Sequence, residues 1–248
     1  MITAKDMQIV IPSRRRVESC AWTVRLFKNP IVCVAAEEAD DYRDKVNAEI
    51  VFHPNDIVGL GPLRQWILDH WKQRLIFQCN DDVRSLYCVV GFRPRKIVDP
   101  EAIERIILNS ANICADLGIS CFSFSPFQDD VRKFRPQKPF SLTRLEGAML
   151  GFIDRKLRYD PKVAQFDDVD LSLECCLKER FCWQDSRFAA EHNFITKGGG
   201  NTISRGLDNT KRELQYMKRK WGPYLGVGYS KETISLKVCV SRIQDLDV

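Results

Sequence analysis

Short apolar runs alternate with amphipathic segments through the first half of the chain, and this alternation limits the folds open to it. The expected strands are residues 8–11, 31–35, 49–52 and 75–78, and the expected helices between them are residues 17–27, 38–46 and 62–71. Strands that alternate with helices in this way build a mostly parallel sheet. The sequence therefore predicts an α/β fold in which helices flank a mixed, mostly parallel sheet.

The second half continues the pattern and adds clear boundary signals. Asp99 as cap, Pro100 in the first turn and Gly118 just past the end predict a helix over residues 100–117. Further strands are expected at residues 87–90, 120–125 and 145–153, a surface loop at 127–143, a helix at 168–179 and an extended segment at 180–188. The glycines of residues 145–153 suggest a strand that passes close to a ligand.

The end of the chain is strongly basic. Thr210 and Glu213 have the spacing of a capping box, which predicts a basic helix that starts there and ends at Trp221, and residues 233–241 alternate as a closing strand. With 248 residues, 44% hydrophobic, the chain can bury a full core. We expect one catalytic domain over residues 1–205, with a basic C-terminal helix and strand, residues 206–248, packed on it.

Composition bears on location and partners. No apolar run reaches the roughly 18 residues of a membrane span, and residues 1–7 lack a secretion signal, so we expect a cytoplasmic protein. Ten cysteines without a CxxC pair, many in apolar stretches, are expected to be reduced core residues. The net charge of +5 is concentrated in residues 14–16, 132–138 and 211–220, which favours a polyanionic partner.

The first acidic cluster follows the apolar strand that ends near residue 78. Asn80, Asp81 and Asp82 stand where open α/β sheets place their ligand crevices, and a carboxylate pair there is costly unless a cation or a proton transfer uses it. Such a pair can hold Mg²⁺ or Mn²⁺ against a diphosphate, with His192 as a third ligand or a phosphate contact. The alternatives are an ordinary turn and a surface histidine.

The second acidic cluster opens the helix expected at residue 168. Asp168 is the candidate general base, because a helix N-terminus keeps a carboxylate ionised, and Asp167 and Asp170 would adjust its position and pKa. Acidic residues also favour helix starts for stability alone. Both interpretations remain open.

Several residues are candidates for binding a nucleotide. They lie after the first strand, in the helix of residues 62–71, and in a glycine-rich loop: Pro12, Ser13, Arg14, Arg16, Arg64, Lys197, Gly198 and Gly199. A solvated charged face and a ligand-free hairpin are the alternatives, and neither the P-loop nor the GxGxxG motif is present.

Taken in order, these segments resemble the GT-A class of nucleotide-sugar glycosyltransferases, whose fold is Rossmann-like. The resemblance rests on Ile9 to Arg14, on Arg64, on Ile76 to Asp82 as the DXD-like metal site, and on Phe166 to Leu173 as the base motif before a helix. It covers about the first two hundred residues. Residues 64–68 and 181–188, leading into His192 and the glycine loop, are similar to the TET-associated glycosyltransferases of bacteriophages.

This resemblance implies a metal-dependent enzyme. It would move a sugar from a UDP-sugar, with UDP-glucose as the expected donor, to a 5-hydroxymethylpyrimidine in phage DNA, with 5-hydroxymethylcytosine as the expected base, in the host cytoplasm. Asn80 replaces the first acidic position of the metal site, so Asp82 is expected to bind Mn²⁺ or Mg²⁺ directly and Asp81 to contact the ribose or a metal-bound water. Asp167 replaces the usual Glu, which leaves Asp168 and Asp170 both open as the base.

Basic side chains outside the two clusters are candidates for contacting DNA phosphates. They lie in the loop of residues 127–143 and in the C-terminal helix: Arg132, Lys133, Arg135, Lys211, Arg212 and Lys218. Two other readings compete with the DNA-modifying enzyme. One is an enzyme of the same fold with a saccharide or other acceptor, and the other is a non-catalytic DNA-binding protein.

Overall fold

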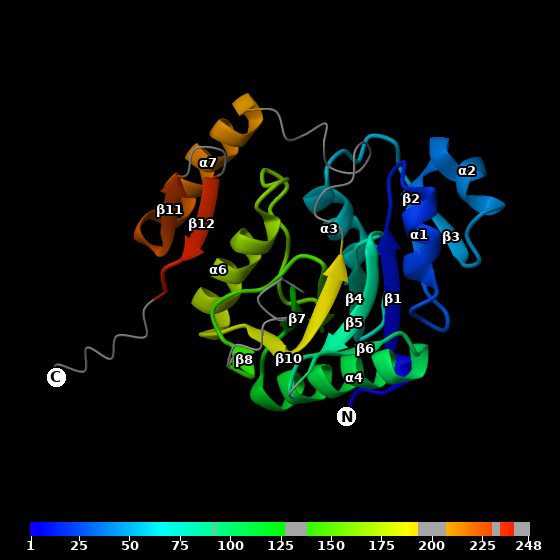
Figure 1. The fold of residues 1–248 in the computed structure, drawn as a ribbon. Helices are drawn as coiled ribbons and strands as arrows, with labels where there is room; N and C mark the ends of the chain where they lie inside the picture. The colour runs from blue at the N-terminus through cyan, green and yellow to red at the C-terminus, as the bar shows by residue number, and fades with distance from the viewer. Residues whose placement is uncertain (92, 127–137, 193–206, 230–233, 241–248) are drawn as a thin grey trace.

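The computed structural model describes residues 1–91, 93–126, 138–192, 207–229 and 234–240. Within them, one large sheet carries helices on its faces (Figure 1). Its strands are β1 Met7–Pro12, β2 Ile31–Ala35, β3 Glu49–His53, β4 Leu75–Cys79, β5 Val83–Cys88, β6 Arg95–Ile97, β7 Cys121–Pro126, β8 Phe140–Ser141, β9 Met149–Ile153 and β10 Trp183–His192. The helices beside this sheet are α1 Val17–Val24, α2 Ala39–Arg43, α3 Leu60–His70, α4 Pro100–Leu117 and α6 Asp167–Glu179.

The sheet has the order β3-β2-β1-β4-β9-β7-β10-β5-β6, and the short strand β8 pairs with β10. Strands β3, β2, β1 and β4 are parallel neighbours, as are β7 and β10, whereas β9 is antiparallel to both β4 and β7. The predicted α/β fold with a mixed, mostly parallel sheet is therefore confirmed. Because β1 to β4 run in one direction, their carboxyl ends meet at one edge of the sheet.

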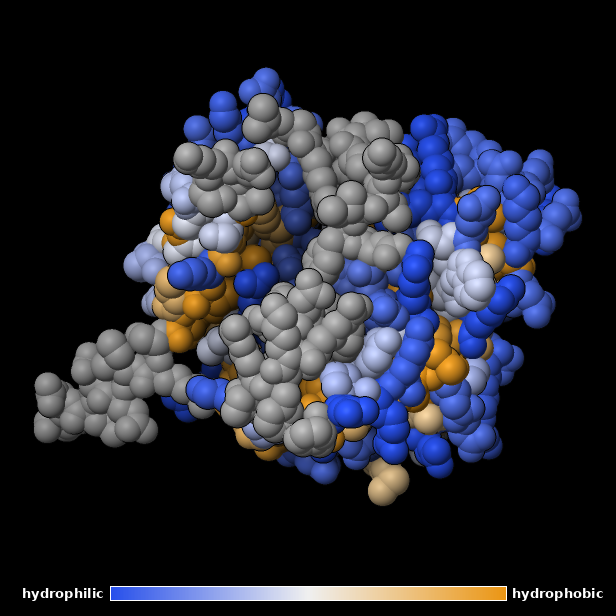
Figure 2. Space-filling model, viewed as in Figure 1, coloured by the Kyte–Doolittle hydropathy of each residue, from blue (hydrophilic) through white to orange (hydrophobic). Residues whose placement is uncertain are grey.

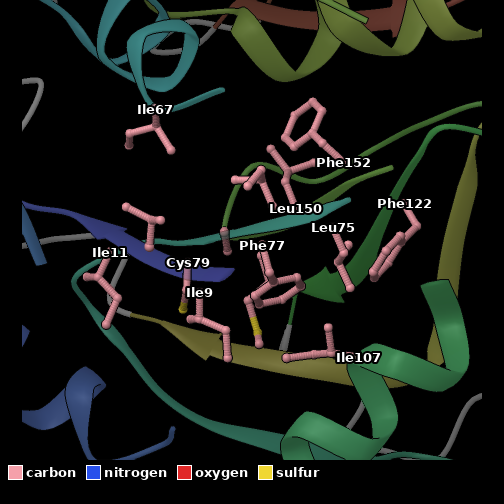
Figure 3. Close-up of a cluster of buried hydrophobic side chains, with 14 of the residues drawn as sticks. Ile9, Ile11, Ile67, Leu75, Phe77, Cys79, Ile107, Phe122, Leu150 and Phe152 are labelled. Atoms are coloured by element: carbon pink, nitrogen blue, oxygen red, sulfur yellow. The ribbon is translucent and has the colours of Figure 1, made fainter. Parts of the chain in front are cut away.

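The hydrophobic core fills both sides of these strands. Figure 3 shows Ile67 of α3 and Ile107 of α4 on opposite sides of the sheet, and Phe77 of β4 and Phe122 of β7 belong to the same buried cluster. A Cβ added to Gly151 would lie 2.2 Å from Cε1 of Phe122. Gly151 therefore makes room for an aromatic ring.

The boundaries of α4 follow the sequence signals. Asp99 accepts a hydrogen bond from the backbone N–H of Ala102 at 2.9 Å, and Gly118 ends the helix with φ +73°. Helix α1 ends earlier than expected, at Val24, where the chain turns and buries Leu26 and Phe27.

The basic C-terminal segment forms a separate small unit. It consists of α7 Leu207–Trp221 and a hairpin of β11 Leu225–Tyr229 and β12 Ile234–Val238. The predicted closing strand thus pairs with β11 and not with the large sheet. The predicted capping box is also wrong, because Thr210 and Glu213 lie inside α7. Leu214 and Met217 of α7 pack in a second hydrophobic cluster that includes Val169 and Leu173 of α6.

All ten cysteines are free thiols, and eight of them are buried. Cys88 is only half-buried and Cys239 is exposed, so the prediction of a core position is wrong for Cys239. In the described part of the chain, no helix combines the length and apolarity needed to cross a membrane.

Candidate active site

A cavity of about 300 Å³ opens at the carboxyl ends of β1 to β4, where the crossover between strands leaves a crevice in sheets of this type. The residues that line it include Pro12, Ser13, Arg14, Arg16, Glu37, His53, Asn55, Arg64, Asn80, Asp81, Asp82, Glu146, Gly147, Gln165, Asp167, Asp168 and His192. Both acidic clusters therefore meet in one space, although they are more than eighty positions apart in the chain.

The first cluster is held by the loop after β1. The hydroxyl of Ser13 donates to Oδ2 of Asp81 at 2.6 Å, and it also contacts the Tyr42 hydroxyl at 2.8 Å. Nη1 of Arg16 lies 3.3 Å from Oδ1 of Asp81 and 3.5 Å from Oδ2 of Asp82. Burial raises the pKa of Asp81 to about 6, although Ser13 and Arg16 both act to lower it.

These residues fit a divalent cation. Asp81 and Asp82 are adjacent and buried, and the contacts from Arg16 are long, so added positive charge would stabilise the pair. Burial lowers the pKa of His192, although the charge of Asp82 acts to raise it, so the neutral, ligating form of the imidazole is favoured. Carboxylate oxygens with an imidazole suit Mn²⁺. Among the described residues, no group of three acidic, histidine or cysteine side chains is arranged to hold a metal ion.

Arg64 connects the two clusters. Its side chain is 1% exposed, and its Nη1 donates to Oδ2 of Asp167 at 2.5 Å. Its Nη2 donates to Oδ1 of Asn80 at 2.8 Å and to the carbonyl oxygen of Gly147. The pKa of this guanidinium is raised because the nearby carboxylates, Asp167 foremost, outweigh the opposing effect of burial. The neutral Asn80 is thus an acceptor for Arg64, which leaves Asp167 as its ionic partner.

The three carboxylates in the first turn of α6 have different surroundings. Asp167 pairs with Arg64, whereas Asp170 lies outside the cavity lining and accepts hydrogen bonds from Lys220 and Trp221. Asp168 lines the cavity and is half-buried there. Its loss of hydration, with the neighbouring carboxylates Asp167 and Glu146, raises its pKa to about 7.

The cavity brings together most of the candidates taken from the sequence. Within its lining are Pro12, Ser13, Arg14, Arg16, Arg64, Asp81, Asp82, Asp168 and His192. Asp170 is placed elsewhere. Lys197, Gly198 and Gly199 of the glycine loop, and Arg132, Lys133 and Arg135 of the basic loop, lie outside the described residues.

Other cavity residues were missed in the sequence. Glu37 follows the end of β2, His53 is the last residue of β3 and Asn55 follows it, so the same strand-end rule that selected Asp82 could have found them. Burial lowers the pKa of His53, whose ring Nδ1 lies 2.9 Å from the carbonyl oxygen of Pro54. Glu146 precedes β9 with no sequence pattern to mark it.

Helix α7 approaches the rim of the cavity at Thr210. The Thr210 hydroxyl donates to the side chain of Gln165, a cavity residue, at 2.9 Å. Lys211 and Arg212 are the next two residues, and both are exposed, as is Lys218 almost two turns further along. In Figure 2 the coloured atoms at the upper left, where α7 lies, are mostly hydrophilic.

Solved structures with similar folds include proteins in complex with nucleotides or nucleotide sugars. TarS 1–349 from S. aureus in complex with UDP-GlcNAc has a TM-score of 0.53 and 11% identity, over 86% of this chain and 66% of that one. Glucosyl-3-phosphoglycerate synthase from Mycobacterium tuberculosis, in complex with Mn²⁺, UDP and glucosyl-3-phosphoglycerate, has a TM-score of 0.54 and 11% identity, over 94% and 87% of the two chains. Mannosyltransferase PcManGT from Pyrobaculum calidifontis, in complex with GDP-Man and Mn²⁺, has a TM-score of 0.55 and 12% identity, over 86% and 64%.

These similarities define the fold as that of a GT-A glycosyltransferase, as predicted. The chain spans less than two thirds of the TarS and PcManGT chains, so it corresponds to part of those proteins. No curated protein sequence matches it significantly. The model of the TET-Associated Glycosyltransferase family matches residues 7–200, and the chain belongs to this family.

Proposed function

We propose that the protein transfers a sugar from a UDP-sugar to the hydroxymethyl group of 5-hydroxymethylcytosine in phage DNA, with UDP-glucose as the donor. The observation that carries this proposal is that the two acidic clusters share one cavity. Sugar transfer needs positive charge beside the departing diphosphate and a base beside the acceptor hydroxyl, and each cluster can serve one of these needs. The family name places the chain among glycosyltransferases, and the acceptor and the sugar are our inference.

The donor end of the cavity is the loop after β1 with Asp81 and Asp82. The structural neighbours bind UDP, UDP-GlcNAc or GDP-Man, some of them with Mn²⁺ or Mg²⁺, which supports a nucleotide sugar and a divalent cation here. Asp82 would hold the cation with help from His192, and a bound cation would supply positive charge beside the departing diphosphate. Ser13 keeps Asp81 in place, and Arg16 adds a further positive charge.

The chemical step assigns one role to Asp168. Its carboxylate removes the proton of the acceptor hydroxyl, and the oxygen then forms a bond to the anomeric carbon of the sugar. The bond from that carbon to the diphosphate breaks, and UDP leaves with the electron pair, so a single displacement inverts the anomeric centre. A carboxyl group with a pKa of about 7 is suited to this work, because it is largely ionised just above neutral pH and still basic enough to accept a proton.

The proposal of a DNA acceptor rests on the position of the hydroxymethyl group in DNA and on the positive charge of α7. The 5-substituent of a pyrimidine projects into the major groove, so its hydroxyl is open to attack from a protein surface. Lys211 and Arg212 are exposed and follow Thr210, which contacts the cavity residue Gln165, and they would hold the flanking phosphates.

The test is a transfer assay. The protein is incubated with Mn²⁺, a panel of UDP-sugars and DNA that contains 5-hydroxymethylcytosine, and the digested nucleosides are weighed by mass spectrometry. We expect a mass increase of one hexose, lost in Asp82→Ala and in EDTA. Unmodified nucleosides with every donor, together with transfer to a saccharide acceptor, would refute the DNA acceptor.

A further inference from the structure

We infer that the C-terminal unit of α7, β11 and β12 is a clamp that holds the first turn of α6 and so positions Asp168 at the cavity. The inference rests on the proposed role of Asp168. The family match ends at residue 200, so the clamp lies beyond the part of the chain that the family model covers. Figure 1 shows α7 and the hairpin beside α6, on the side away from the large sheet.

One contact fixes the start of α6. Glu213 of α7 is buried, and its Oε1 accepts hydrogen bonds from the backbone N–H groups of Gln165 and Phe166, both at 2.8 Å. The amides at a helix start lack partners within the helix, and Phe166 provides no side-chain cap of its own. A carboxylate from another helix therefore takes the place of the local cap, directly before Asp167.

A second contact fixes the far side of the same turn. Nζ of Lys220 lies 2.8 and 2.9 Å from the two oxygens of Asp170, and the Trp221 indole donates to Oδ1 at 2.7 Å. Lys220 also donates to Asp160 at 2.8 Å, and the Tyr216 hydroxyl donates to the same carboxylate at 2.6 Å. Asp170 is 2% exposed, and such a carboxylate is stable as an ion only with partners of this kind.

The opposite side of the turn is held by the core. Arg64 pairs with Asp167, so two of the three carboxylates point to fixed cations on different sides of α6. Asp168, between them in sequence, lines the cavity beside Asp167. Because a displacement of about 1 Å at a reacting group costs about 100-fold in rate, holding the turn from both sides has a direct catalytic effect.

The test compares the clamp with a surface pair on the same helix. Lys220→Met and Glu213→Ala should each lower kcat by about 10- to 100-fold, with KM for the UDP-sugar within about twofold, because the donor end of the cavity is built by other elements. Lys220→Arg and Glu213→Gln keep a donor or an acceptor in place and should recover most of kcat. The control is Lys178→Met, which removes the exposed contact between Lys178 and Glu174 of 2.6 Å and should leave kcat unchanged.

Hydrogen exchange at the amides of residues 167–170 gives a readout that needs no acceptor or donor. We expect faster exchange in Glu213→Ala and Lys220→Met, and wild-type exchange in Lys178→Met and in both conservative variants. Wild-type exchange and wild-type kcat in Glu213→Ala and Lys220→Met would overturn the clamp. If wild-type protein leaves DNA unmodified and transfers the sugar to a saccharide, the proposed acceptor is refuted, while the exchange rates still decide whether the clamp holds α6.

Discussion

Removal of the Arg64 guanidinium should cost more stability than removal of any exposed cation. The side chains of Arg64 and Asp167 are 1% and 8% exposed, with Nη1 and Oδ2 2.5 Å apart, so Arg64→Met leaves a buried carboxylate without its cation. Breaking a buried pair in this way costs about 3–5 kcal/mol in the free energy of unfolding. The exposed pair of Arg74 and Asp154, 3.0 Å apart and 45% and 41% exposed, should be worth about 0–1 kcal/mol.

Urea unfolding of wild type, Arg64→Met and Arg74→Met measures this difference. Asp167→Asn combined with Arg64→Met should recover part of the loss, because the uncompensated charge is then gone. The argument would be refuted if Arg64→Met were no less stable than Arg74→Met, or if the double variant were less stable than Arg64→Met alone.

Two further predictions concern the reaction. If Asp168 is the base, kcat should rise with pH, because the ionised fraction of a group with a pKa of about 7 grows from about one tenth at pH 6 to about nine tenths at pH 8. A pH–rate profile that is flat over this range would contradict the assignment. A loss of kcat of less than about 100-fold in Asp168→Asn would also contradict it. The double variant Lys211→Ala/Arg212→Ala should lose two phosphate contacts, so the slope of log affinity for DNA against log salt concentration should fall by about two. UDP binding, measured by calorimetry, should be unchanged. An unaltered salt slope would exclude these side chains from the DNA contact.

Local patterns along the chain were enough to determine the fold class. Alternating strands and helices over residues 8–78 set the parallel half of the sheet, and Asp99 with Gly118 marked the ends of α4. These features depend on neighbours within a few positions, so the residues themselves carry the information. The position of Asp82 at the carboxyl end of a buried strand was also readable, and the same rule extends to Glu37, His53 and Asn55.

The C-terminal segment shows where local reasoning failed. Thr210 and Glu213 have the spacing of a capping box, but Glu213 caps α6, whose start lies 47 positions away at Phe166. The alternation of β12 was readable, whereas its partner β11 was not. A capping or strand pattern indicates that a residue makes a certain kind of hydrogen bond. It does not indicate which segment of the chain provides the partner of that bond.

The roles of the acidic residues depended on tertiary structure for the same reason. Asp167, Asp168 and Asp170 are close in sequence, yet the helical turn points them in different directions. Their surroundings come from Arg64, 103 positions from Asp167, and from Lys220, 50 positions from Asp170. Contacts over such distances form only when the sheet and α7 bring the segments together. The sequence therefore left Asp168 and Asp170 both open as the base, and the fold places Asp168, not Asp170, at the cavity.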